Sequence, residues 1–354
     1  MNPKDDMADR RLPGADAAAR RTDSVTIAEV ARLAGVSMMT VSRALNRPEK
    51  VSRKTLELVQ KAIDTVGYVP NLLAGSLRSS KSRIVAAIVP SIETSMFAAA
   101  VEALSDRLSE AGYEVLLGLS GFDQSKEDRI LSAVLSRKPD AIFLTGIRHS
   151  TQARRQLLAA GIPVVESWDL TPSPIDMAVG FSHFGAGQCA ARHLLSKNHR
   201  RFAVIAASDE RALQRRDGFT AELAHHGITA AATVTSAPGT LELGRSAFAE
   251  LVRREAVPDA LFCTSDPLAQ GAITEAQVSG MNVPNEVAVM GFGGFSFSAH
   301  MHPTLTTISF DRRKIGLIAA DAILSELNGM PRHDRVIDIG FHLLERESTG
   351  TSRS

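Results

Sequence analysis

The sequence is poor in cysteine, in aromatic residues and in long apolar runs. Its two cysteines, Cys189 and Cys263, are too few and too far apart for a disulfide framework or a zinc site. Aromatic residues make up only 5% of the chain. No apolar run reaches the ~18 residues that a membrane-spanning helix needs, and the amino terminus, MNPKDDMADRR, is too charged for a secretory signal. We therefore expect a cytoplasmic protein with no membrane partner.

Motifs for catalysis and cofactor binding are also missing. GFGGFS at 291–296 has serine where a dinucleotide-binding loop requires its last glycine, and the chain contains no GxxxxGK[ST] phosphate loop. GLSG at 118–121 is one residue short of a nucleophile elbow. The histidine pairs at 225–226 and 300–302 lack a third metal ligand at a suitable spacing. The sequence thus predicts a protein that is not an enzyme and has no cofactor or metal.

Length and charge distribution indicate several domains with different partners. The 354 residues, 44% of them hydrophobic, can bury a substantial core and exceed one typical domain. The net charge is +1, but residues 24–83 contain ten Lys or Arg against four Asp or Glu. Such a basic segment is expected where one end of a chain meets a polyanion. Residues 1–23 are polar and lack an apolar stripe, so we expect a disordered tail.

Residues 25–46 predict two short helices separated by a tight turn. Apolar residues recur at helical spacing until Gly35 interrupts the pattern, and a second helical run begins at Ser37. Val41, Ala44 and Leu45 can form the buried stripe of that run. Its outer face then carries Ser37, Met38, Thr40, Ser42 and Arg43. Hydroxyl groups can bond phosphate oxygens and a guanidinium can pair with a guanine edge, although a solvated face is the ordinary alternative.

A third helix and a linker follow. Residues 52–66 begin with Ser52 as a predicted N-cap and carry an apolar stripe, so three helices can share one small core. Residues 67–83 have the Gly, Pro, Asn and Ser content of a linker, although NLLAGSLRS within them could form a short helix on binding.

The segments TIAEVARLAGVSMMTVSRALN and VSRKTLELVQKAIDTVGYVPN, with the linker after them, resemble the lactose-repressor family of bacterial transcription regulators. The resemblance implies operator DNA as partner, with Arg43 contacting a base and Met38 and Met39 at positions that vary with the operator sequence. Methionine donates no hydrogen bond and would read thymine methyl groups or shape. The hinge leucine that wedges into the minor groove corresponds to Leu77, followed by Arg78. Phosphate contacts are implied for Thr26, Ser37, Thr40, Ser42, Asn46, Ser52 and Thr55.

From residue 84 onward, strand-like and helical stretches alternate. Apolar runs with helices between them predict parallel sheets covered on both faces. The predicted strands form two series, so we expect two Rossmann-like subdomains with a cleft between them, and chain crossings near 179–183 and 307–310. The first series is 84–90, 114–120, 141–146 and 163–167, and the second is 201–208, 230–237, 260–265 and 287–292.

In an open α/β sheet a ligand binds beyond the carboxyl ends of the strands. This rule selects Ser91 to Phe97, Glu166 to Trp168, the region of Arg215, and Asp266. Arg215 in QRRDGF matches the family motif whose arginine binds effector, with Arg216 as the alternative assignment. Asp266 matches an effector-binding aspartate, but it also precedes a proline and could simply cap a helix. Trp168 could either stack against a sugar ligand or pack in the hydrophobic core.

The effector class follows from a narrower resemblance. IVPSIETSMFAAAVEAL, VVESWDLTPSPIDMAVGFSH and GFGGFSFSAH resemble the gluconate-operon repressors of the family. Gly293 and Gly294 stand where two acids are usual, which would suit an anionic effector such as gluconate or a related aldonate. The alternatives are a family regulator of another sugar or of a co-repressor-type ligand and, more distantly, a stand-alone sugar-binding protein.

The resulting prediction is a helix-turn-helix DNA-binding domain plus an α/β periplasmic-binding-protein-like regulatory domain. The chain end lacks a leucine heptad, so a homodimer is the simpler expectation. The predicted boundaries are 1–23 tail, 24–69 DNA-binding domain, 70–83 hinge, 84–345 regulatory and dimerisation domain, and 346–354 tail. Within the regulatory domain we expect one subdomain at about 84–180 and 311–330, and the other at about 181–306 and 331–345.

Overall fold

The computed structural model describes residues 25–69, 81–93, 95–235, 238–330 and 334–350. The chain forms two separate units, residues 1–80 and 81–354, and each is described by itself. Among these residues no helix is long and apolar enough to cross a membrane. The predicted hinge residues Leu77 and Arg78 lie outside the described residues.

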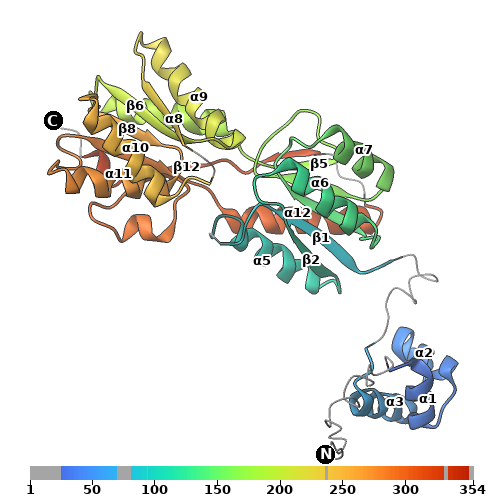
Figure 1. Cartoon of the computed structure of the whole chain (residues 1–354). Coiled ribbons are helices and arrows are strands. Elements are labelled where there is room, and N and C mark those ends of the chain that lie inside the picture. Colours follow the sequence, from blue (N-terminus) through green and yellow to red (C-terminus); the bar gives the residue numbers. More distant parts are fainter. Residues whose placement is uncertain (1–24, 70–80, 94, 236–237, 331–333, 351–354) are drawn as a thin grey trace, which may run out of the picture. The chain divides into compact units, whose positions relative to one another are not determined.

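Residues 25–69 of the first unit form three α-helices and a short 3-10 turn (Figure 1). Gly35 ends the first helix with a left-handed φ of 65°, and the Ser37 hydroxyl accepts a bond from Thr40 N to begin the second. Ser52 caps the third helix in the same way through Thr55 N, which confirms its predicted role. The predicted apolar stripes meet in one core around Val30, Val41 and Val59. The elements are α1 (Ile27–Ala34), α2 (Met38–Asn46), η1 (Pro48–Lys50) and α3 (Arg53–Val66).

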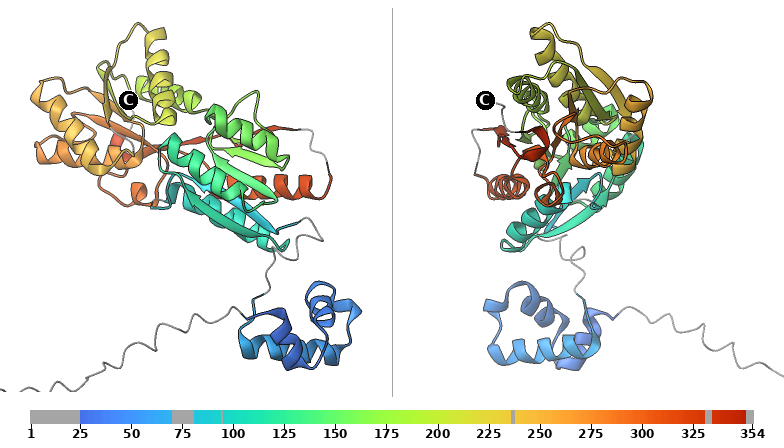
Figure 2. Two further views of the ribbon diagram at one scale, coloured as in Figure 1. Left: turned by 45° about the vertical axis from the view of Figure 1, so that its right-hand side comes forward. Right: turned by 90° about the vertical axis from the view of Figure 1, so that its left-hand side faces the viewer.

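The second unit consists of two α/β lobes, each built on a six-stranded and mostly parallel sheet (Figures 1 and 2). The first sheet has the order β11-β5-β4-β3-β1-β2 and the second β12-β10-β9-β8-β6-β7. The first-sheet strands are β1 (Ile84–Val89), β2 (Glu114–Leu119), β3 (Ala141–Thr145), β4 (Val164–Ser167), β5 (Met177–Gly180) and β11 (Val336–Asp338). The second-sheet strands are β6 (Phe202–Ala207), β7 (Ala231–Thr235), β8 (Ala260–Cys263), β9 (Ala288–Phe292), β10 (Thr306–Ser309) and β12 (His342–Leu344).

Helices cover both faces of each sheet because successive strand residues point to opposite sides. In β1, for example, Val85 and Ala87 belong to the core shared with α5 and α12, whereas Ala86 and Ile88 belong to the core under α6 and α7. The second sheet is covered by α8 and α9 on one face and by α10 and α11 on the other. The helices are α5 (Ser95–Ser109), α6 (Gln124–Leu135), α7 (Thr151–Ala160), α8 (His183–Ser196), α9 (Glu210–His225), α10 (Leu241–Arg253), α11 (Asp266–Val278) and α12 (Arg312–Leu327), with 3-10 turns η2 (Ser296–Ala299) and η3 (Glu347–Thr349).

The lobes are connected where the sequence predicted, with one exception. The chain leaves the first lobe after β5 and returns after β10, and α12 packs against α5 of the first lobe. The predicted subdomain boundaries imply a third crossing at 330–331, but it lies between β11 and β12. Residues 336–338 pair with β5 in the first sheet, so assigning all of 331–345 to the second subdomain was wrong. Strands of three or four residues, such as β5 and β11, are too short to show a clear pattern in the sequence.

Candidate functional site

The outer face of α2 exposes the side chains selected from the sequence. Met38 is 56% and Met39 68% exposed, and Arg43 is exposed one turn further on. Large apolar side chains on a small domain are usually buried, so two adjacent exposed methionines form a surface with no role in the described core. Arg43 has no described hydrogen-bond or ion-pair partner, and its guanidinium is available to an external acceptor.

The hydroxyl groups selected as phosphate contacts hold the helix starts. Ser37 Oγ lies 2.9 Å from Thr40 Oγ1, and Ser52 Oγ lies 2.8 Å from Thr55 Oγ1. The Asn46 amide donates to the Ser42 carbonyl at 2.8 Å. The Thr26 side chain makes no cap bond. Both capped helices therefore present exposed hydroxyls beside their free amino-terminal N–H groups, an arrangement that suits phosphate oxygens.

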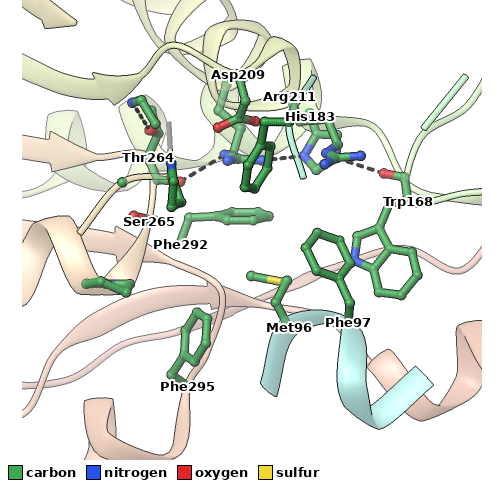
Figure 3. Close-up of a pocket in the computed structure, with 16 residues that line it drawn as sticks. Met96, Phe97, Trp168, His183, Asp209, Arg211, Thr264, Ser265, Phe292 and Phe295 are labelled. Atoms are coloured by element: carbon green, nitrogen blue, oxygen red, sulfur yellow. Dashed lines mark hydrogen bonds between the residues drawn. The ribbon is translucent and has the colours of Figure 1, made fainter. Parts of the chain in front are cut away.

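The second unit contains a cavity of about 110 Å³, partly open to solvent, between the ends of the two sheets (Figure 3). Met96, Phe97 and Trp168 line it from the first lobe. The second lobe contributes polar residues and rings: His183, Asp209, Arg211, Arg215, Thr264, Ser265, Phe292 and Phe295. The cavity thus combines aromatic walls with two guanidinium groups, where the strand-end rule placed a ligand.

Arg215 is the most constrained cation of the cavity. It is 6% exposed, its Nε donates to Thr264 O at 3.0 Å, and its guanidinium carbon lies 4.0 Å from the centre of the Phe292 ring. Burial lowers the pKa of Arg215 to about 10, so it remains charged at neutral pH. No carboxylate among the described residues lies within ion-pair distance of it, whereas Arg216 pairs with Asp217. The guanidinium therefore can accept an anionic partner from the cavity.

Two glycines explain why Arg215 can reach this position. A Cβ on Gly218 would lie 2.0 Å from the carbonyl oxygen of Phe184, and one on Gly187 would lie 2.0 Å from that of Arg215. Helices α8 and α9 consequently approach each other closely, which brings Arg215 to His183. The Arg-x-x-Gly spacing noted in the sequence thus has a packing reason.

His183 connects Arg215 to the first lobe. Arg215 Nη1 lies 2.7 Å from His183 Nδ1, and His183 Nε2 lies 2.7 Å from the Trp168 carbonyl oxygen (Figure 3). Burial, together with the charges of Arg215 and Arg211, lowers the pKa of His183 well below its usual value. The imidazole is therefore neutral. His183 was not among the residues predicted for the site, because its role depends on a contact between the lobes that no local sequence pattern reveals.

Trp168 lines the cavity and also packs in the core. It is 2% exposed and contacts the Phe97 ring edge-on, with centroids 5.0 Å apart. Its Nε1 is buried without a hydrogen-bond partner in the described structure, and so is the Oγ of Ser265. Leaving a buried donor unpaired is unfavourable, so a ligand hydroxyl could satisfy either group.

Three residues selected from the sequence do not line this cavity. Ser91 Oγ accepts from Glu93 N at 3.0 Å, and Glu166 is fully buried, where it accepts from Ile175 N at 2.6 Å. Asp266 is also fully buried, and burial raises its pKa. Ser265, not Asp266, is the N-cap residue of α11, so the predicted capping was wrong.

The carboxylate of Asp266 is occupied by the second lobe itself. It accepts from Thr307 Oγ1 at 2.6 Å, Ser298 Oγ at 2.7 Å and Phe295 N at 2.9 Å. These bonds hold the segment after β9 against β10. Asp266 thus shapes the cavity wall near Phe295 without facing the cavity.

The glycines after β9 also have a steric reason. Gly293 has a φ of 130°, and a Cβ there would lie 2.7 Å from the Phe295 ring. Gly294 has a φ of 62°, and its Cβ would lie 2.2 Å from Ser309 Oγ. Acidic side chains would not fit this backbone, so their absence follows from packing whatever the charge of a ligand.

A helix-turn-helix unit joined to a two-lobed α/β unit with a cavity between its lobes defines a DNA-binding regulator with a separate regulatory domain. Comparisons with known proteins agree. Residues 26–71 match the model of bacterial regulatory proteins of the lacI family, and residues 191–349 match a periplasmic binding protein-like domain. The chain belongs to the lacI family and is a DNA-binding transcriptional regulator, as the fold and family resemblance predicted.

Individual relatives are similar over nearly their whole length. The HTH-type transcriptional regulator GntR of Pseudomonas aeruginosa is 37% identical over 93% of this chain and 97% of that protein. GntR of Escherichia coli (strain K12) is 30% identical over 89% of this chain and 96% of that protein. A crystal structure of a LacI-family transcriptional regulator from Silicibacter pomeroyi superposes with a TM-score of 0.87, at 30% identity, over 92% of this chain and all of that chain. These relatives are regulators, not enzymes.

Proposed function

We propose that the cavity binds a sugar acid, gluconate or a related aldonate, and that this ligand modulates operator binding. The observation that carries the proposal is Arg215, a buried cation at the cavity wall that has no carboxylate partner among the described residues. Burying a charge is costly; Asp209 and Asp169 offset part of this cost from beyond ion-pair distance, and an anionic ligand would offset more of it. Arg211 adds a second positive group to the same wall.

The polyol part of such a ligand has partners as well. The unpaired Nε1 of Trp168 can donate to a hydroxyl oxygen, and Ser265 Oγ can donate or accept. The aromatic walls can cover the carbon chain. Of the effector residues selected from the sequence, Phe97, Trp168 and Arg215 are retained, while Ser91, Glu166 and Asp266 act through the structure around the cavity.

On the DNA side, Arg43 would contact a base and Met38 and Met39 would lie against the groove. The hydroxyls at the starts of α2 and α3 would bind phosphates, which fix register and carry no sequence information. The relatives named GntR are HTH-type transcriptional regulators, which supports this general role.

The working unit would be a homodimer on a palindromic operator. Strand β2 lies at the edge of the first sheet and leaves Leu117 and Leu119 each 38% exposed, which suits a contact between subunits. In the absence of effector the dimer would repress. The effector would favour a second arrangement of the two lobes in each subunit. This change would weaken operator affinity by ~1–3 kcal/mol, the usual range of allosteric coupling.

The test is an anisotropy titration of the full-length protein on an operator selected from random duplexes. D-gluconate should reduce operator affinity about 5- to 150-fold, whereas increased affinity would identify a co-repressor. Arg215→Ala should still bind the operator but lose the response. Arg216→Ala, one position away, is the matched control and should respond normally. If gluconate, ketoaldonates and their phosphates all leave wild-type affinity unchanged, the sugar-acid proposal fails.

A further inference from the structure

His183 lies at the point where the chain passes from the first lobe to the second. It is the first residue of α8, two residues after buried Phe181 and three after the end of β5. Its ring is 1% exposed and packs edge-on against Phe181, with centroids 4.6 Å apart. The imidazole therefore cannot turn freely, and its two nitrogens have fixed directions.

The two hydrogen bonds of His183 determine where its proton is. Arginine can only donate, so Nδ1 must accept from Arg215 Nη1 at 2.7 Å. A neutral imidazole then carries its hydrogen on Nε2, which donates to the Trp168 carbonyl at 2.7 Å. The His183 ring thus connects a cation of the second lobe to the backbone of the first lobe through two hydrogen bonds in series.

Trp168, which accepts the second of these hydrogen bonds, has an unusual backbone conformation. Trp168 has a φ of 70°, which bulky residues rarely adopt. Its N–H donates to Val179 O at 3.0 Å and its carbonyl accepts from His183, so bonds on both sides hold the peptide that orients the indole. Releasing the bond from His183 would let this segment relax.

We propose that His183 is a positioning residue that couples the ligand contact at Arg215 to the conformation of Trp168 at the end of β4. This proposal rests on the proposed function in one respect, namely that the ligand is an anion. An anion that pairs with Arg215 competes for the N–H groups that point to His183 Nδ1. Ligand binding at Arg215 in the second lobe thereby changes the hydrogen bond from His183 to the Trp168 carbonyl in the first lobe. The two lobes are coupled through this one imidazole.

The two bonds can be separated by substitution. In His183→Asn the side-chain oxygen can lie near the position of Nδ1 and accept from Arg215, but nothing reaches Trp168 O. In His183→Gln the amide nitrogen can lie near the position of Nε2 and donate to Trp168 O, but the acceptor for Arg215 is displaced. Each variant loses one bond, so their stabilities should be similar and thermal unfolding will verify this.

Trp168 is the only tryptophan of the chain, so its fluorescence reports on the site directly. With D-gluconate and full-length protein, we expect His183→Asn to keep its affinity within about 3-fold but to show a smaller ligand-induced fluorescence change than wild type, because the ligand then acts on Trp168 only by direct contact. His183→Gln should bind about 10-fold more tightly, because the ligand then has no imidazole acceptor to displace from the charged Arg215. Equal behaviour of the two variants would overturn the coupling.

A second experiment needs no ligand, so it tests the coupling through His183 independently of the effector assignment. Arg215→Gln should change the fluorescence lifetime of Trp168 in the wild-type background and much less with His183→Asn, whereas Arg216→Gln should have no effect in either. Additive effects of the substitutions at 215 and 183 would overturn the coupling. If wild-type protein ignores gluconate but the effects are non-additive, only the effector assignment fails.

Should the His183 variants not fold, hydrogen exchange of the segment 166–170 decides the question. Arg215→Gln should speed exchange there relative to Arg216→Gln, because the imidazole loses the donor that holds it. Identical exchange in both proteins would overturn the proposal.

Discussion

A buried histidine between two carboxylates should make the first lobe sensitive to alkaline pH. His149 Nδ1 lies 2.6 Å from Glu127 Oε1, and its Nε2 lies 3.5 Å from Glu166 Oε1. Burial by itself lowers the pKa of His149, but the hydrogen bond to Glu127 and the charges of Glu127 and Glu166 outweigh it and raise the pKa to about 9. The side chain is 1% exposed, so solvent screening is small.

The sign and size of the effect follow from this pKa. The folded value lies above the ordinary value of 6.5, so the stabilisation is complete below about pH 6.5 and is lost as pH rises through 9. At about 1.4 kcal/mol per pKa unit, the free energy of unfolding should fall by about 3 kcal/mol between pH 6 and pH 9 from this group.

Urea unfolding followed by Trp168 fluorescence measures this directly, because Trp168 lies two residues after Glu166 in the same lobe. His149→Gln should be less stable than wild type at pH 6 and should lose much less stability between pH 6 and pH 9. Glu127→Gln keeps the histidine but removes its nearer carboxylate, and should show an intermediate dependence. Equal pH dependence in wild type and His149→Gln would show that the imidazole is not charged in the folded protein.

Three further predictions concern the other parts of the chain. Arg43→Ala should reduce discrimination between the selected operator and random duplex by ~1–3 kcal/mol in an anisotropy assay and leave gluconate binding unchanged; unchanged discrimination would remove Arg43 from the base contacts. Gly218→Ala should lower the free energy of unfolding by ~1–3 kcal/mol, because the new methyl group meets the Phe184 carbonyl, whereas a stabilised protein would mean that the helices are less close than 2.0 Å implies. Asp266→Asn should destabilise the second lobe in thermal unfolding yet keep gluconate affinity within about 3-fold, and a large loss of affinity with normal stability would restore Asp266 as an effector contact.

Local patterns in the sequence were sufficient for the elements and most of the fold. Gly35, Ser37 and Ser52 mark helix ends through their own backbone or hydroxyl chemistry, and the structure confirms each role. Long apolar strands such as β1 and β6 are equally plain, since a strand buried on both faces needs a continuous apolar run. The short strands β5 and β11 depend on neighbours distant in sequence, which no local pattern reveals.

The cavity was predictable only in part, because its polar groups are assigned by packing. Arg215 was identified through its motif, but His183 looked like one residue of a chain crossing. Asp266 shows the opposite case: its position after β8 suggested a ligand contact, yet three donors within the lobe occupy the carboxylate. A sequence shows which groups can bind a ligand, while the fold decides which of them have already found partners.

The first turns of α9 bring these observations together, since they reach the other lobe at three points. Glu210 pairs with Arg148, Gln214 Nε2 donates to Asp169 Oδ2 at 2.8 Å, and Arg215 reaches Trp168 through His183. Residues 210 and 214 lie on one face of the helix by their spacing, Arg215 lies about 100° further round, and the glycine contact with α8 fixes the direction of both. A rotation of the lobes must therefore alter several bonds of one rigid helix at once. A ligand that contacts only Arg215 can bias all of them, because the helix moves as a unit.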